Sequence, residues 1–415
     1  MGTARQPVRG VKRGERVPQV AGCIALFALQ GCSGGDGRAA SAATTPAPTV
    51  SVALSQTASV SGPSASSASP ATPSVPNVVA GVALGCDQCT CAWTTWGEVY
   101  CWGNNEFGML GDGMTTDQHR PVRVQLPDKA IQVASGAYYS CALLETGEVW
   151  CWGSYDKGAI PGGSRSGSPT KPVKIHDLEK IQIIDVANSS GIAVDREGLA
   201  VGWGLECPGG TCRVVLKRRP ELDHSLLIHE ELLVGCSTTQ AHDVDCWTSL
   251  QDRALQTAAH SPPGIRMHMP RARSMSVSFH TACFAVEGGD AYCWGQAADG
   301  YSVWSTPTRL DNFSNVKELS IYFQSMCAVH EDGTVSCWGL TKNGPVEDNA
   351  TWLRLKPEIV PNLKNVNSIV TRGHTCAITD GGELFCWGPN ERGQLGDGTT
   401  TSRLEPIRVV LGERD

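Results

Sequence analysis

The sequence predicts an all-β protein, a seven-bladed β-propeller, on three observations. A unit built around one tryptophan recurs seven times, at intervals of 44–51 residues. Each of these tryptophans is followed, 13–20 residues later, by a proline. The 46 glycines and 24 prolines among 415 residues are typical of many short strands joined by tight turns. Repeats of this length indicate blades that bury their apolar faces against one another.

The unit reads Cys-Ala-x-x-x-x-Gly-x-Val-x-Cys-Trp-Gly, with changes from copy to copy. It spans residues 91–103, 141–153, 283–295, 327–339 and 376–388. A partial copy runs from 236 to 247, and a copy without cysteine runs from 192 to 204. The tryptophans in phase are Trp102, Trp152, Trp203, Trp247, Trp294, Trp338 and Trp387. Four short strands fit into each interval, which is the size of one propeller blade.

Within the unit, two cysteines face each other across a predicted β-hairpin. Residues 91–101 alternate around a turn, so Cys91 lies opposite Cys101, and opposed Cβ atoms about 4.5–5.5 Å apart suit a disulfide. The copy without cysteine lacks both members, with Ile192 and Gly202 in their places. This joint loss favours pairing within a repeat over pairing between repeats; independent buried thiols are the alternative. The other expected pairs are Cys141 with Cys151, Cys236 with Cys246, Cys283 with Cys293, Cys327 with Cys337 and Cys376 with Cys386.

The two ends of the repeat region predict how the ring closes. The last unit is followed by residues 406–410, which match the opening strand of a further unit with no remainder. Residues 78–85 match the missing continuation, as found in residues 130–136. We therefore expect the propeller to cover residues 78–413, with one blade built from both termini.

The repeat resembles the regulator of chromosome condensation family. The resemblance lies in the Trp-Gly signature and in the glycine-rich loops Gly-Gln-Leu-Gly-Asp-Gly-Thr at 393–399 and Gly-Met-Leu-Gly-Asp-Gly at 108–113, which the other five copies lack. It covers about residues 78–413 and implies a seven-bladed propeller. It also implies two activities: nucleotide exchange on a small GTPase, as in nuclear members, and inhibition of β-lactamases, as in some exported members. The cysteine pair resembles bacterial, exported members.

The N-terminus resembles a bacterial lipoprotein signal peptide. Five basic residues precede a short apolar stretch at 19–30, too short to span a bilayer as a stable anchor. It ends in Leu-Gln-Gly before Cys32, which is similar to a lipobox, so residues 1–31 are the expected signal peptide and Cys32 the lipidation site. An ordinary signal peptide cleaved nearby is the alternative. The 18 cysteines favour an oxidising compartment, and Ser33 suits the outer membrane or the cell surface.

Residues 32–77 are expected to form a disordered tether. Ser, Ala, Thr and Pro dominate this segment, and no charged residue occurs from 39 to 86, so too little apolar surface is available to offset the chain entropy. The predicted signal peptide holds five positive charges and one negative charge, so its removal takes the formal net charge from −7 to −11. An acidic mature chain argues against nucleic acid as a partner.

No motif indicates catalysis, a metal or a cofactor, and we expect a protein that is not an enzyme. The Gly-Asp-Gly sequences at 111–113 and 396–398 lack the spacing of a calcium loop or a phosphate loop, so tight turns are expected. Neither a His-Glu-x-x-His nor a Gly-x-Ser-x-Gly motif occurs. Because no second pair completes a zinc site, further disulfides are expected between Cys86 and Cys89 and between Cys207 and Cys212.

The polar loops after the Trp-Gly marks share one phase of the repeat, so in a closed ring they lie on one face. Large aromatic side chains there are candidate anchors for a ligand, unless each packs against its own blade: Tyr155, Tyr301, Trp304 and Trp352. We expect a monomeric binding module for a protein or glycan at the cell envelope, held to the membrane through its lipid anchor. The alternatives are an exchange regulator of a small GTPase, an enzyme inhibitor and an enzyme.

Overall fold

The computed structural model describes most of the chain from Asn77 to Gly412. The described residues are 77–85, 88–155, 160–161, 168–206, 213–230, 234–238, 244–248, 265–267, 271–278, 281–296, 303–311, 313–323, 325–341 and 352–412. The predicted signal peptide (1–31), the predicted lipidation site Cys32 and all but the last residue of the predicted tether (32–77) lie outside them. No helix in the described part is long and apolar enough to cross a membrane.

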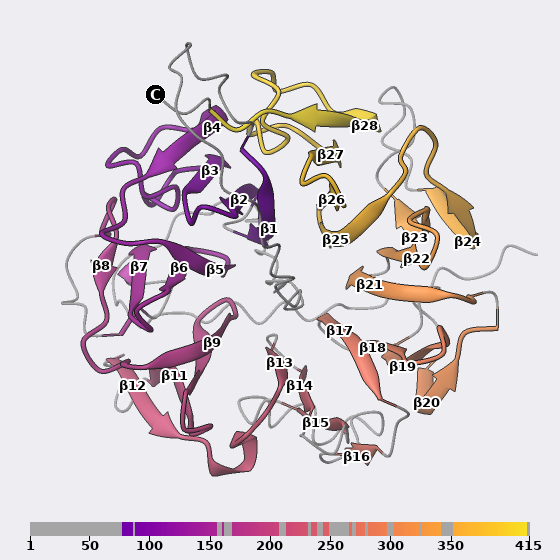
Figure 1. Cartoon of the computed structure of the whole chain (residues 1–415), viewed down its shortest axis with the longest axis horizontal. Helices are drawn as coiled ribbons and strands as arrows, with labels where there is room; N and C mark the ends of the chain where they lie inside the picture. Colours follow the sequence, from indigo (N-terminus) through magenta and orange to yellow (C-terminus); the bar gives the residue numbers. More distant parts are fainter. Residues whose placement is uncertain are drawn as a thin grey trace, which may run out of the picture. The chain divides into compact units, whose positions relative to one another are not determined.

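The described strands form seven four-stranded antiparallel sheets, each made of strands consecutive in the chain, which confirms the predicted propeller. Figure 1 shows them around a ring, with the first strand of each innermost. Blades 1 to 3 are β1 (Val79–Gly85), β2 (Cys89–Thr94), β3 (Val99–Gly103), β4 (Gln118–Val124); β5 (Ala130–Ser135), β6 (Tyr139–Leu144), β7 (Val149–Gly153), β8 (Val173–Lys174); and β9 (Ile181–Val186), β10 (Ser190–Asp195), β11 (Ala200–Glu206), β12 (Arg213–Arg218).

The remaining blades follow the same order, and a 3-10 turn, η2 (Pro220–Leu222), connects blade 3 to blade 4. Blades 4 and 5 are β13 (Leu227–Glu230), β14 (Val234–Thr238), β15 (Val244–Thr248), β16 (Ile265–Met267); and β17 (Ala272–Ser278), β18 (Thr281–Val286), β19 (Ala291–Gln296), β20 (Val303–Arg309). Blades 6 and 7 are β21 (Val316–Tyr322), β22 (Ser325–His330), β23 (Val335–Thr341), β24 (Trp352–Ile359); and β25 (Val366–Arg372), β26 (His374–Thr379), β27 (Leu384–Gly388), β28 (Arg403–Val409).

The second and third strands of each blade form the hairpin that the cysteine spacing predicted. The cysteines of each pair lie directly opposite each other in six of the hairpins. In blade 3, Ile192 lies opposite Gly202, so the same hairpin forms there without a disulfide. All six predicted pairs within repeats are confirmed as disulfides, each with a Cα–Cα distance of 4.1 Å: Cys91 with Cys101, Cys141 with Cys151, Cys236 with Cys246, Cys283 with Cys293, Cys327 with Cys337 and Cys376 with Cys386.

The hydrophobic core lies between the blades rather than within them. Seven clusters of buried residues occur, and each joins two neighbouring blades. The cluster around Trp102, for example, combines Val82 and Leu84 of blade 1 with Val370 and Leu395 of blade 7. A single blade therefore has no core of its own, and the ring must close before its apolar surface is buried.

The ring closes by packing between whole blades, and the expectation of one blade built from both termini is wrong. The strand that contains Pro406 is the outer strand of blade 7, and residues 79–85 open blade 1. Blades 7 and 1 are joined by the same backbone hydrogen bond that joins other neighbouring blades: the Val79 amide donates to the carbonyl of Gly382 in the blade 7 turn at 2.9 Å. The Ala130 amide bonds Gly97 of blade 1 in the same way, at 3.0 Å.

The outer strand explains the proline of several units, although Pro220 lies in the 3-10 turn η2 instead. Pro121 and Pro406 lie in β4 and β28, the outer edges of their sheets, where an amide N–H is not needed for the ladder. The ladder also shifts register at these strands, between the pairs that involve Cys101 and Gly103 in blade 1. Proline and an irregular register together protect an exposed edge from pairing with another chain.

Side chains of several inner strands bond the backbone of the next inner strand. The Ser276 hydroxyl accepts from the Ile321 amide at 3.0 Å, and Gln132 bonds both backbone groups of Ile184, at 3.1 and 2.9 Å. An inner strand is the free edge of its sheet, so these bonds satisfy backbone groups that would otherwise be buried without a partner.

Candidate binding face

The two faces of the ring carry different kinds of connection. In an antiparallel four-stranded sheet, the connection from the third to the fourth strand leaves on the opposite side from the turn between the second and third. We call these sides the loop face and the turn face. On the loop face, the connections between the third and fourth strands contain 6 to 19 residues, whereas the turns between the second and third strands contain four residues in six blades and five in blade 4. Length therefore varies most in these third-to-fourth connections of the loop face, although the connections between blades, on the turn face, also vary, from 4 to 8 residues.

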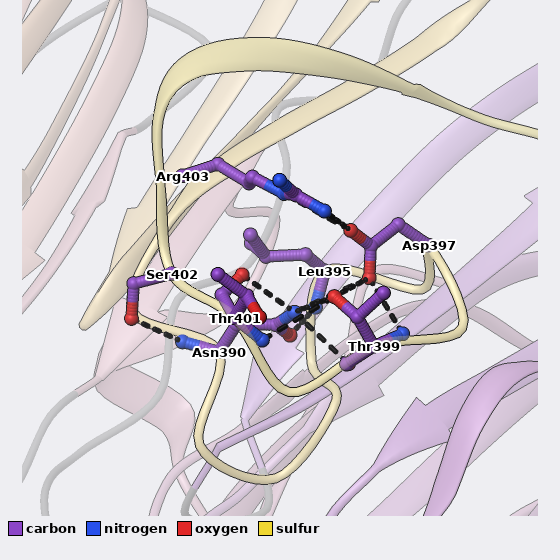
Figure 2. Close-up of polar contacts among 7 residues, drawn as sticks. All are labelled: Asn390, Leu395, Asp397, Thr399, Thr401, Ser402 and Arg403. Atoms are coloured by element: carbon purple, nitrogen blue, oxygen red, sulfur yellow. Dashed lines mark hydrogen bonds and ion pairs between the residues drawn. The ribbon is translucent and has the colours of Figure 1, made fainter.

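The loop of blade 7, residues 389–402, is ordered around one buried asparagine, as Figure 2 shows. The Asn390 amide donates to the carbonyls of Thr399 and Thr401, at 3.0 and 3.1 Å. Its side-chain oxygen accepts from the Leu395 amide at 2.9 Å. One side chain thus holds three points of the loop.

Asp397 also stabilises this loop, because both of its carboxylate oxygens accept hydrogen bonds from residues near it in the chain. One carboxylate oxygen accepts from the Thr399 amide and hydroxyl, at 2.8 and 2.7 Å, and the other pairs with Arg403 at 2.8 Å (Figure 2). Partial burial opposes ionisation, but these bonds outweigh it and hold the pKa of Asp397 below its usual value. The Gly-Asp-Gly sequence at 396–398 is a structural turn, as predicted.

The loop of blade 1, residues 104–117, repeats this arrangement. The Asn105 amide donates to Asp112 and to the Thr116 carbonyl, both at 3.1 Å, and its oxygen accepts from the Leu110 amide at 3.0 Å. Neither asparagine was among the residues singled out from the sequence. The signal was present, because Asn105 and Asn390 both lie two residues after the glycine of Trp-Gly.

Each of these loops also accepts a hydrogen bond from the tryptophan of the next blade. The Trp102 indole N–H donates to the carbonyl of Gln394 in the blade 7 loop, and the Trp152 N–H to the carbonyl of Met109 in the blade 1 loop, both at 2.8 Å. Gly396 packs so closely on Trp102 that a Cβ atom would lie 2.7 Å from the indole nitrogen. The glycine-rich motif is therefore a contact between blades, and it holds the loop face rigid here.

A buried polar chain strengthens the same contact. The Thr90 hydroxyl donates to the Gln394 carbonyl at 2.8 Å, so its oxygen accepts from Nε2 of His374 at 2.7 Å. Burial lowers the pKa of His374 to about 3, and the imidazole is neutral. His374 is thus a structural residue.

The structure places the four aromatic candidates differently from the prediction that all lie in loops. Tyr155 follows β7, is partly buried and packs against the core between blades 2 and 3, where burial raises the pKa of its phenol. Trp304 lies within β20 and packs between blades 5 and 6. Trp352 begins β24, and Tyr301 lies outside the described residues. Their role as anchors stays a prediction.

Two predicted disulfides involve residues outside the described part. Cys86, Cys207 and Cys212 lie there. Cys89 is disulfide-bonded, and none of the described cysteines is its partner. Within the described residues, no group of three or more His, Cys, Asp or Glu is placed to hold a metal ion.

Phe323 is a further residue on the loop face that sequence reasoning missed. It lies in the connection between β21 and β22 with φ +50°, a conformation costly for a bulky side chain, and it is 53% exposed. Its amide donates to Ser278 at 2.8 Å, and its ring packs edge-on against Tyr322. The buried guanidinium of Arg372 lies over the Tyr322 ring, 5.9 Å from its centre. The sequence carries no signal for this strain, because nothing in the local pattern demands a positive φ there.

Comparison with known proteins agrees with this architecture. The family model of the regulator of chromosome condensation (RCC1) repeat matches residues 97–143, and a second model of the same repeat matches 130–158 and 371–394. These matches include the whole of the glycine-rich sequence at 108–113 and the first two residues of the one at 393–399.

Solved structures share the fold at low identity. Human WBSCR16 is 18% identical, with a TM-score of 0.65 over 76% of this chain and 95% of that chain. Prp20p from Saccharomyces cerevisiae is 16% identical, with a TM-score of 0.63 over 75% and 85%. Yeast RCC1 (Prp20), in a structure with Kap60, is 17% identical, with a TM-score of 0.62 over 75% and 83%. With its matched repeats and seven blades, the chain belongs to the family of propellers built from regulator of chromosome condensation repeats.

Proposed function

We propose that this chain is an exported, lipid-anchored binding protein of the cell envelope that recognises a protein partner through its loop face. The contrast between two kinds of connection carries the proposal: the third-to-fourth connections on the loop face contain 6 to 19 residues, whereas the turns of the hairpins on the opposite face contain four or five. Rigid scaffolds that vary only in the loops of one face are typical of binding proteins.

Two further observations support the proposal. Six hairpin disulfides favour an oxidising compartment over the cytosol, where an exchange regulator of a GTPase would act. Prp20p has binding properties toward Gsp1p and histones, and yeast RCC1 is bound to Kap60, so propellers of this fold do bind proteins. If the ligand is a glycan instead, free sugar should compete with it for binding to the propeller.

Phe323 is the best residue with which to test the loop face. A strained and exposed aromatic gives little to stability, so its presence favours a role in binding. Phe323→Asn places a residue that tolerates positive φ at the same position. We expect the affinity for the partner to fall about thirtyfold while the melting temperature does not fall.

The partner is first captured from envelope extract on the immobilised full chain and identified by mass spectrometry. Its affinity for the purified wild type and Phe323→Asn is then measured by calorimetry, and thermal melts are recorded in parallel. Ile359→Asn is the matched control, because Ile359 is also exposed, at 60%, but lies at the end of the outer strand β24 on the turn face. Equal affinities for wild type and Phe323→Asn, with weaker binding by the control, would place the binding site elsewhere.

The anchor has its own test. Cys32→Ser removes the predicted lipidation site, so the chain should move from the membrane fraction to the soluble fraction, because the acyl chains supply the membrane affinity. Fractionation followed by immunoblotting measures this. Cys23→Ser, inside the predicted signal peptide, should leave the distribution unchanged. Persistence of the Cys32→Ser chain in the membrane fraction would refute lipid anchoring.

A further inference from the structure

The turn face carries an exposed apolar pair at the junction of blades 1 and 2. Trp96, at the centre of the β2–β3 turn, is 48% exposed, and Ile131, in the inner strand β5, is 47% exposed. One backbone bond joins the segments that carry them, because the Ala130 amide donates to the Gly97 carbonyl at 3.0 Å. Ile131 is also the extra residue of a β-bulge, between the paired residues Ala130 and Gln132, which turns it away from the ladder.

The other blades provide an internal comparison for both positions. In the place of Trp96, the described four-residue turns have Thr146, Glu197, Gly288, Asp332 and Gly381. In the place of Ile131, the bulges of the other inner strands have Ala80, Gln182, Arg273, Lys317 and Asn367. Both positions are thus polar or small everywhere else, and a large apolar residue occupies both at one junction alone among those described. We call Trp96 and Ile131 the Trp96 patch.

The charges around the Trp96 patch also differ from those of other junctions. At two other junctions, the residue that precedes the inner strand forms an ion pair with the turn of the same blade: Lys180 with Glu197, and Arg271 with Glu287. Lys129 occupies the corresponding position beside the patch, with Thr146 in the place of Glu197 and Glu145 in the place of Glu287. Exposed Glu145 precedes that threonine, and neither it nor Lys129 forms an ion pair with a described residue.

We propose that the Trp96 patch is a self-association surface, whose occupant is the same patch of a second copy of this chain. A twofold axis through the patch packs Trp96 and Ile131 on their own counterparts, as an isologous interface requires. The same axis brings Lys129 of one copy against Glu145 of the other, so the charges at the rim complement themselves. A patch this small supports a weak, reversible dimer. The inference rests on described residues and is independent of the lipid anchor and of loop-face binding.

Sedimentation velocity on the full chain tests the proposal, with the Cys32→Ser form used so that no lipid drives association. We expect reversible dimerisation between about 1 and 100 µM, the range of small transient interfaces. Trp96→Thr, which copies the residue of blade 2, should weaken the dimer at least about thirtyfold, as loss of a tryptophan anchor does. Met114→Thr is the matched control, because Met114 is 58% exposed on the loop face, and it should dimerise like the wild type.

Charge reversal tests the geometry of the pair. Lys129→Glu alone should weaken the dimer, and Lys129→Glu with Glu145→Lys should restore it, because the two opposite charges then meet again across the axis. Thermal melts confirm that each variant is folded. A chain that stays monomeric over the whole range overturns the proposal, and so does a dimer that Trp96→Thr leaves unchanged. Trp96-dependent binding of the monomer to phosphatidylcholine vesicles would also overturn it, by assigning the patch to lipid.

Discussion

Trp102→Ala is expected to lower the free energy of unfolding by about 3–5 kcal/mol, the loss typical of a large buried side chain cut to alanine. Trp102 is completely buried and belongs to the cluster that joins blades 1 and 7. Its truncation removes apolar contacts on both blades and leaves a cavity at the ring closure. It also removes the N–H that donates to Gln394, although that carbonyl keeps its bond from Thr90.

Equilibrium denaturation in urea measures this loss, with tryptophan fluorescence and far-ultraviolet circular dichroism as independent probes. Trp96→Ala is the control, since the exposed Trp96 should change stability by less than about 0.5 kcal/mol. Trp102→Phe weighs packing against hydrogen bonding, because it keeps much of the apolar volume but removes the N–H. If Trp102→Ala is as stable as Trp96→Ala, the ring closure does not depend on this cluster.

Glu318→Gln is expected to stabilise the protein at alkaline pH by about 2 kcal/mol. Glu318 lies in β21 and accepts from the Ser368 hydroxyl at 2.9 Å and the Ile369 amide at 3.2 Å, both in β25. Burial between these strands raises the pKa of its carboxyl to about 7, from an ordinary value of 4.5, despite these bonds and the neighbouring Lys317. We take a figure below the full linkage value, because the residue is only partly buried.

The sign of the pH effect follows from the direction of this shift. An acid whose pKa is higher in the folded state contributes stability that is complete below pH 4.5 and is lost as the pH rises through 7. The wild type should therefore match Glu318→Gln near pH 4.5 and fall below it above pH 7. Glutamine suits the site, because Gln132 makes equivalent bonds between β5 and β9.

Thermal and urea denaturation across this pH range measure the difference between the two proteins. Glu287→Gln, which changes an exposed glutamate of blade 5, is the control and should keep the pH dependence of the wild type. Parallel pH profiles for Glu318→Gln and the wild type would mean that the carboxyl is solvated in the folded protein.

The hairpins and their disulfides were predictable because the pairing is local. Cys91 and Cys101 are ten residues apart around a four-residue turn, so the strand period alone places them opposite each other. The start of a blade was not predictable in this way. A periodic sequence has no intrinsic first strand, and only the pairing of Val122 with Cys101, across a loop of 14 residues, assigns the proline strand to the preceding hairpin.

The candidate binding face was predictable in position but not in detail. The phase of the loops follows from the repeat, whereas the packing of an aromatic residue depends on a neighbouring blade far away in the sequence. Trp304, in β20, pairs with Gly295 of β19 and contacts the core between blades 5 and 6, although the surrounding sequence is typical of a polar loop. The strained Phe323 depends on Ser278, 45 residues earlier, which accepts its amide.

The closure of the ring by whole blades has a kinetic consequence. At six of the seven junctions, the polypeptide chain runs directly from one blade to the next. Neighbouring blades that separate there stay close and pack together again quickly. Blade 7 and blade 1 have no such link, and only non-covalent contacts join them, among them the hydrogen bond from Asn77 to the carbonyl of Gly412. The ring should therefore open first at the junction of blades 7 and 1. The Val79 amide, which donates across this junction, should then exchange its hydrogen with solvent faster than the Ala130 amide at the junction of blades 1 and 2.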